Sequence, residues 1–121
     1  MIFIIDGTLP SLNEMITTAK KSKYAYAEMA EVAKNKVSWS AIRDLGRIKL
    51  EPSDYRMMWY CPNKRKDKDN VIAGQKYIFD GLQEAGFLKN DGWSQIGRIT
   101  HDFDVDAAYP RIEVYITEVS K

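Results

Sequence analysis

Two carboxylates two residues apart, Asp67 and Asp69, form the part of this sequence best suited to chemistry. Three consecutive bases lead directly into them: Lys64, Arg65 and Lys66. Carboxylate oxygens are ligands that Mg²⁺ prefers, and a bound cation assists phosphodiester hydrolysis by activating water and stabilising negative charge. A third carboxylate, Asp91, would join the same cation if the chain folds back. The stretch therefore predicts a Mg²⁺ site beside bases that attract phosphate.

Local structure offers simpler explanations for the same residues. Asp67 or Asp69 can cap a helix, and Asp91-Gly92 is typical of a reverse turn. The three bases are ordinary for a solvated loop. Taken on the residues alone, these roles outweigh the metal site.

A helix from about Asn70 to Ala85, capped by Asp69, must position the carboxylates. Its apolar stripe consists of Val71, Ile78, Leu82 and Ala85, with Ile72 and Phe79 on the shoulder. Gly74 and Gly81 lie seven residues apart on one flank, where they indicate close approach by another backbone or a ligand. Gly86 then fits a C-terminal cap.

Lys76 would lie two turns from Asp69 on the same face of that helix, where it can stabilise charge on a phosphate. Its alternative role is an ion pair with Asp80, four residues on, worth about 0.3 to 0.5 kcal/mol when exposed.

Taken together with the rest of the chain, these patterns predict a single α/β (α+β) domain that covers residues 1–121. Ser11 and Glu14 have capping-box spacing, and residues 15–45 form one helix, or two broken near residues 20–22. Strands are expected at residues 2–5, 55–60, 95–103 and 111–119. The order is strand, helix, strand, helix, strand, strand, which gives a mixed or antiparallel sheet packed against two main helices.

Composition indicates a single globular domain with an uneven charge distribution. Residues 1–66 hold 12 Lys and Arg against 7 Asp and Glu, whereas residues 67–121 hold 6 against 10. This asymmetry suits a protein that meets phosphates with one surface and a cation with another. The only cysteine is Cys61, and no apolar run approaches a signal core or a membrane span. We therefore expect a cytoplasmic protein without membrane contact.

Other motifs are excluded by their details. Asp102, Asp104 and Asp106 have the spacing of a calcium loop, but Ala107 occupies the position that requires glycine. They are better explained as one polar face of a strand. His101 is the only histidine and is typical of a structural residue. No P-loop or dinucleotide fingerprint occurs, so no nucleotide cofactor is expected.

The order of motifs resembles the RusA family of Holliday-junction resolvases, found in bacteria and their prophages. The matching residues are the basic cluster, Asp67-Lys68-Asp69-Asn70, Lys76, Asp80-Gly81-Leu82, Ala85-Gly86, Asn90-Asp91 and Ser94-Gln95-Ile96. A weaker likeness includes Leu9-Pro10-Ser11-Leu12-Asn13 and the closing strand after Pro110.

The resemblance implies a Mg²⁺-dependent endonuclease, with Mn²⁺ as a possible substitute, that cuts four-way junction DNA as a homodimer during recombination and repair. It implies a metal-binding triad of Asp67, Asp69 and Asp91, with Lys76 in the catalytic set, and places Asn13 near the DNA. The alternatives are a nuclease for other branched DNA, a DNA-binding dimer without catalysis, and a structural phage protein.

Overall fold

A computed structural model describes residues 1–119. The elements in chain order are β1 (Ile2–Asp6), α1 (Leu12–Lys21), α2 (Lys23–Leu45), β2 (Ser53–Cys61), α3 (Lys68–Ile72), α4 (Gln75–Glu84), β3 (Ile96–Val105) and β4 (Arg111–Glu118). The four predicted strands are all present. Each of the two predicted helical regions contains two helices in succession.

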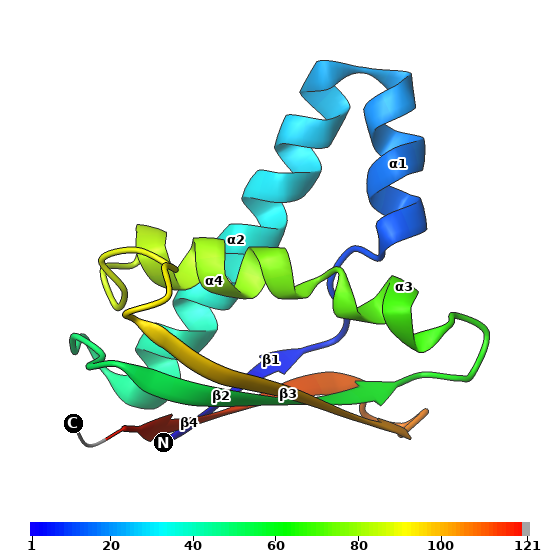
Figure 1. The fold of residues 1–121 in the computed structure, drawn as a ribbon. Coiled ribbons are helices and arrows are strands. Elements are labelled where there is room, and N and C mark those ends of the chain that lie inside the picture. The colour runs from blue at the N-terminus through cyan, green and yellow to red at the C-terminus, as the bar shows by residue number, and fades with distance from the viewer. Residues whose placement is uncertain (120–121) are drawn as a thin grey trace.

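The strands form one mixed sheet in the order β1-β4-β2-β3. β4 is antiparallel to both β1 and β2, whereas β2 and β3 are parallel neighbours. Figure 1 shows the helices on one side of this sheet, with α1 and α2 forming a hairpin that projects away from it. The predicted fold class is confirmed. Within residues 1–119, no helix has the length and apolar character needed to cross a membrane.

Alternating side chains on the strands create the core on the helix-covered face. Along β4, Ile112, Val114 and Ile116 are buried, and Tyr55 and Met57 of β2 are buried beside them. This period of two is the pattern expected when one face of a sheet packs on a core. The predicted alternation in β4 is therefore confirmed.

Serine caps define both ends of α1. Ser11 and Glu14 form the predicted capping box, in which the Ser11 hydroxyl accepts a hydrogen bond from the Glu14 N–H at 3.4 Å. Ser22 follows α1 and also caps α2, its hydroxyl accepting from the Ala25 N–H at 3.0 Å. Of the two alternatives left open by the sequence, two helices broken near residues 20–22 is therefore the correct one.

The single helix predicted for residues 70–85 is wrong. Helix α3 begins earlier, at Lys68, with Asp67 in the N-cap position, and α4 begins only at Gln75. Between them the backbone hydrogen bonds span three residues, as from the Gly74 N–H to the Val71 carbonyl at 3.1 Å. Such 3₁₀-type bonds tighten the turn and shift the helical phase. The amphipathic pattern continues through the break, so periodicity could not reveal it.

Both flank glycines meet other parts of the backbone, as predicted. A Cβ atom added at Gly81 would lie 2.8 Å from the Lys34 carbonyl oxygen and 2.8 Å from Val37 Cβ on α2. One added at Gly74 would lie 3.1 Å from Leu9 Cβ. In addition, the Ser38 hydroxyl of α2 donates to the Gly81 carbonyl at 2.7 Å. The two helices therefore pack at a distance that only glycine permits at position 81.

We expect Gly81→Ala to reduce the free energy of unfolding by about 1 to 3 kcal/mol, because the added methyl group would collide with backbone atoms. Denaturant-induced unfolding followed by circular dichroism measures the change. Gln83→Ala, on a partly exposed face of the same helix, is the matched control and should change stability little. Equal stability of Gly81→Ala and the native chain would contradict this close packing.

His101 supports the sheet through a side-chain contact between the parallel strands. The Trp59 indole N–H donates to His101 Nδ1 at 2.9 Å, and the two rings stack. Burial lowers the pKa of His101 below its ordinary value of 6.5, although the charge of Asp102 acts in the opposite direction. The folded state therefore favours the neutral ring, which alone can accept this hydrogen bond.

The free energy of unfolding should consequently fall as the pH drops below about 6.5, because the unfolded chain then binds a proton that the folded chain resists. Unfolding curves at several pH values between about 7.5 and 5.5 measure this loss. His101→Gln should remove the histidine contribution to the slope. If the variant keeps the full pH dependence in this window, His101 is not its source.

Candidate active site

Asp67 and Asp69 line a surface hollow of about 720 Å³, called here the acidic hollow. It lies where the two parallel strands end, with Cys61 of β2 paired to Val105 of β3. Because parallel strands have the same direction, the segments that follow them leave from one edge of the sheet. That topology places the chain after β2, which carries the bases and the carboxylates, beside the end of β3.

Each carboxylate is positioned by the start of α3. Asp67 occupies the N-cap position in extended conformation, but its side chain makes no capping hydrogen bond. Asp69 is in the first helical turn, and its Oδ1 accepts from the Asn70 N–H at 2.9 Å. Both residues are exposed. The capping role proposed for Asp69 is therefore wrong, and Asp67 holds the cap position without using its carboxylate as a cap.

Lysines surround these carboxylates within the same hollow. Lys64 and Lys66 line it from the basic loop, and Lys68 from the start of α3. The Lys68 ammonium also lies 5.4 Å from the centre of the Phe103 ring, at a distance typical of a cation–π contact. The hollow thus presents acidic oxygens and positive charges to one ligand. A phosphate with a bound divalent cation has the complementary charges.

The start of α1 is attached to this region by two polar contacts. Lys66 Nζ lies 2.5 Å from Glu14 Oε1, and the Asn13 N–H donates to Asn70 Oδ1 at 2.9 Å. Partial burial would raise the pKa of Glu14, but hydrogen bonds from Lys66 and Ser11 outweigh it and lower the pKa below its ordinary value. The backbone of Asn13 therefore lies beside α3.

Asp91 lies apart from the other two predicted ligands. It is exposed in the segment between α4 and β3, which Figure 1 shows in yellow at the end of α4 opposite to α3. At 1.5 Å per residue, the ten residues of α4 span about 15 Å. Within residues 1–119, no three His, Cys, Asp or Glu side chains gather into a group able to hold a metal ion. One chain alone does not bring Asp91 to Asp67 and Asp69.

Lys76 is on α4 and does not line the acidic hollow. Its Nζ lies 3.3 Å from Asp80 Oδ2, which is the ion pair expected as its alternative role. The predicted face shared with Asp69 assumed one continuous helix, and the break before α4 removes that phase relation. Lys76 is exposed.

Asp104 is a carboxylate at this site that the sequence analysis considered only as part of a calcium-loop spacing and did not place beside Asp67 and Asp69. It follows Phe103 near the end of β3 and lines the acidic hollow with Asp67 and Asp69. Its Oδ1 accepts from the Val105 N–H at 2.8 Å. The sequence assigned it to a polar strand face, because alternation alone does not give the parallel register that sets Asp104 opposite Tyr60.

A scan against protein-family models finds no match to this chain, and a search of curated proteins finds none either.

Proposed function

We propose that this chain is a Mg²⁺-dependent, structure-selective endodeoxyribonuclease that resolves Holliday junctions as a homodimer. The observation that carries the proposal is the acidic hollow, in which Asp67 and Asp69 are surrounded by lysines at the start of a helix. Its chemistry suits a phosphodiester, and the order of motifs across most of the chain resembles a resolvase family. The direct test is incubation with a synthetic four-way junction, with Mg²⁺ and with EDTA.

The donor atoms present fit a magnesium ion. Mg²⁺ is usually bound through one or two carboxylates, together with water and substrate phosphate. Asp67 and Asp69 supply two such groups, and the Asp67 carboxylate is free of any capping bond. When bound, the ion would polarise the phosphodiester and assist formation of the attacking nucleophile.

The protein's own groups hold and orient the DNA. Lys64 and Lys66 contact the phosphate that enters the hollow, and Arg65 extends the same positive surface. Lys68 lines the same hollow, where its positive charge would stabilise the negative charge that develops on the phosphoryl oxygens. Lys76 contacts a neighbouring phosphate, and Asn13 lies at the edge of this surface.

A second subunit accounts for Asp91. Within one chain Asp91 lies apart from Asp67 and Asp69, so in this proposal it would be supplied to the ion across a two-fold interface. The partner subunit's Asp91 would then complete each triad, and one dimer would have two identical sites. A four-way junction presents two symmetric strands for paired cleavage, and an isologous dimer matches that symmetry.

Replacing Lys64, Arg65 and Lys66 together by alanine should weaken binding to every DNA shape. If each side chain contacts one phosphate, the slope of log K against log salt should fall in magnitude by about 3. Anisotropy titrations between about 50 and 200 mM salt measure it. The double variant Arg47→Ala/Lys49→Ala, in the loop before β2, should keep the original slope. An unchanged slope in the triple variant would remove the basic loop from the interface.

A further inference from the structure

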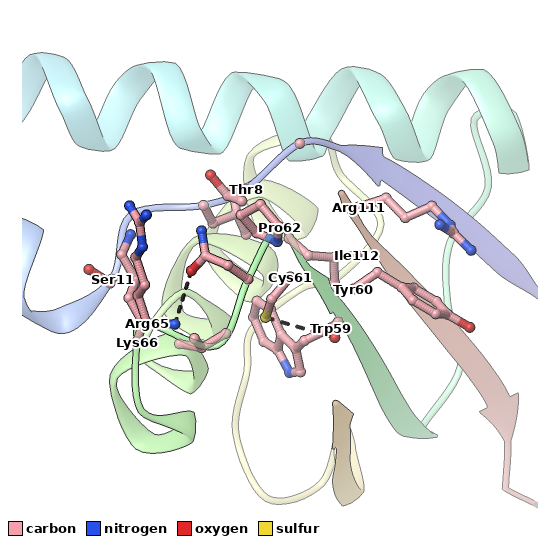
Figure 2. A pocket seen from close by; sticks show the side chains of 14 residues that line it. Thr8, Ser11, Trp59, Tyr60, Cys61, Pro62, Arg65, Lys66, Arg111 and Ile112 are labelled. Atoms are coloured by element: carbon pink, nitrogen blue, oxygen red, sulfur yellow. Dashed lines mark hydrogen bonds between the residues drawn. The ribbon is translucent and has the colours of Figure 1, made fainter. Parts of the chain in front are cut away.

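A second cavity adjoins the acidic hollow and is not used by the proposed chemistry. This apolar cavity has a volume of about 270 Å³ and is shown in Figure 2. Its apolar walls are formed by Leu9, Trp59, Cys61, Val71 and Ile112. They come from the segment after β1, the end of β2, α3 and the start of β4. The cavity is therefore an extension of the core face of the sheet that the helices leave open.

The apolar cavity and the acidic hollow share part of their lining. Cys61, Asn63, Lys66 and Val71 line both of them, so the segment that carries the bases separates one from the other. A DNA strand with a phosphate in the acidic hollow would place its adjacent nucleotide beside the lining that the two cavities share. Arg65 and Lys66 also line the cavity, where they attract the phosphate of that nucleotide.

Polar groups at the rim suit the edge of a base. Asn63 Oδ1 accepts from the Arg65 N–H at 2.9 Å, which is the dashed contact beside the Arg65 label in Figure 2. The Asn63 side chain therefore keeps its amide N–H donors, and Thr8 belongs to the same lining. An apolar cavity with a few convergent polar groups is the usual form of a site for a flat organic ligand.

Trp59 gives this cavity a fixed aromatic wall. Its ring is almost fully buried and is held by the hydrogen bond to His101. Unpaired bases are commonly received by aromatic side chains, with basic groups following the backbone. Unstacking a base costs least where pairing is already disturbed, as at the branch point of a junction.

We propose that the apolar cavity receives an unpaired nucleobase adjacent to the phosphate in the acidic hollow. This inference rests on the proposed function and adds to it. It says that the protein recognises a junction by binding a base that leaves its stack at the branch point. Arg65 and Lys66 hold the phosphate of that nucleotide, and the walls around Trp59 and Cys61 enclose the base. Fully stacked duplex DNA offers no such base and would fill the cavity poorly.

Cys61 provides a direct probe, because it is the only cysteine and lines the cavity. Burial raises the pKa of its thiol, although Lys66 acts in the opposite direction, so alkylation is best followed at a fixed alkaline pH. With Asp69→Asn protein to prevent cleavage, iodoacetamide should react at least about five times more slowly when a four-way junction is bound. Intact duplex of equal length, at equal occupancy, should protect much less.

A surface thiol gives the matched control. In the double variant Cys61→Ser/Asn35→Cys, the thiol lies on an exposed part of α2, away from both cavities, and junction DNA should not change its alkylation rate.

A second experiment measures the environment of the base directly. The emission of 2-aminopurine placed next to the cleaved phosphate should change on binding. Cys61→Phe, which fills the cavity, should abolish that change at junction concentrations that saturate the variant.

The possible results separate the two proposals. If the native protein neither binds nor cuts a four-way junction, the proposed function fails and the base site fails with it. If it cuts junctions but Cys61 is alkylated equally fast with and without the junction, only the base site is overturned. Equal protection by duplex and junction would also overturn it, since DNA would then merely cover the cavity. If Cys61→Phe does not fold, the alkylation result on Asp69→Asn protein decides the matter.

Discussion

Asp69→Asn should lower the rate of junction cleavage by about 10³-fold or more while leaving junction affinity nearly unchanged. The substitution removes the charge of a proposed metal ligand but keeps the shape of the side chain, and a loss of roughly 4 kcal/mol in transition-state stabilisation corresponds to that factor. Asp67→Asn should behave in the same way, because its carboxylate makes no capping bond that the fold requires. Single-turnover cleavage of a labelled junction in Mg²⁺ measures the effect.

The control for both variants is Glu28→Gln, which neutralises an exposed carboxylate on α2 outside the acidic hollow. It should cleave at the native rate. Circular dichroism should show that all three variants are folded. An Asp69→Asn protein that cuts junctions at the native rate would show that this residue holds no essential cation.

Mixing two inactive proteins should restore cleavage if Asp91 acts across the dimer. In a heterodimer of Asp69→Asn and Asp91→Asn chains, one site has lost both carboxylates. The other combines an intact Asp69 with the partner's Asp91. Activity should rise from near zero to that of one working site, and the product should be a nicked junction rather than a resolved one.

The heterodimers can be formed by co-expression with two different affinity tags. A mixture of Asp67→Asn and Asp69→Asn chains is the control, because these residues belong to the same site and every heterodimer should stay inactive. Failure of the Asp69→Asn and Asp91→Asn pair to regain nicking would refute the shared site. A monomer that makes paired incisions would refute the dimer mechanism altogether.

Much of the fold follows from local sequence signals. Strand alternation and the Ser11 capping box depend on residues close together in the chain, and both were predicted. The break at Ser22 is also local and was one of the two alternatives that the sequence left open. The break at Ala73 and Gly74 was not predicted, because the segment after β1 packs against Gly74, and that contact joins distant parts of the sequence. The parallel pairing of β2 with β3 is likewise a property of chain topology.

The candidate site could be predicted only where its residues are neighbours in sequence. Asp67 and Asp69 lie with the bases because one short segment carries them all. The position of Asp91 depends on the direction of α4 and of the segment after it, which no local pattern specifies. Asp104 enters the acidic hollow through the register of β3 on β2, a long-range pairing that alternation does not reveal.

The most direct test of the central claim is a cleavage assay on a synthetic four-way junction labelled in turn on each strand. The protein should make two symmetric incisions near the branch point in Mg²⁺, none in EDTA, and few in linear duplex of the same sequence. Mn²⁺ should restore cleavage after removal of Mg²⁺. Absence of incision in any strand at protein concentrations that saturate the junction, or equal cutting of linear duplex, would contradict the proposed function.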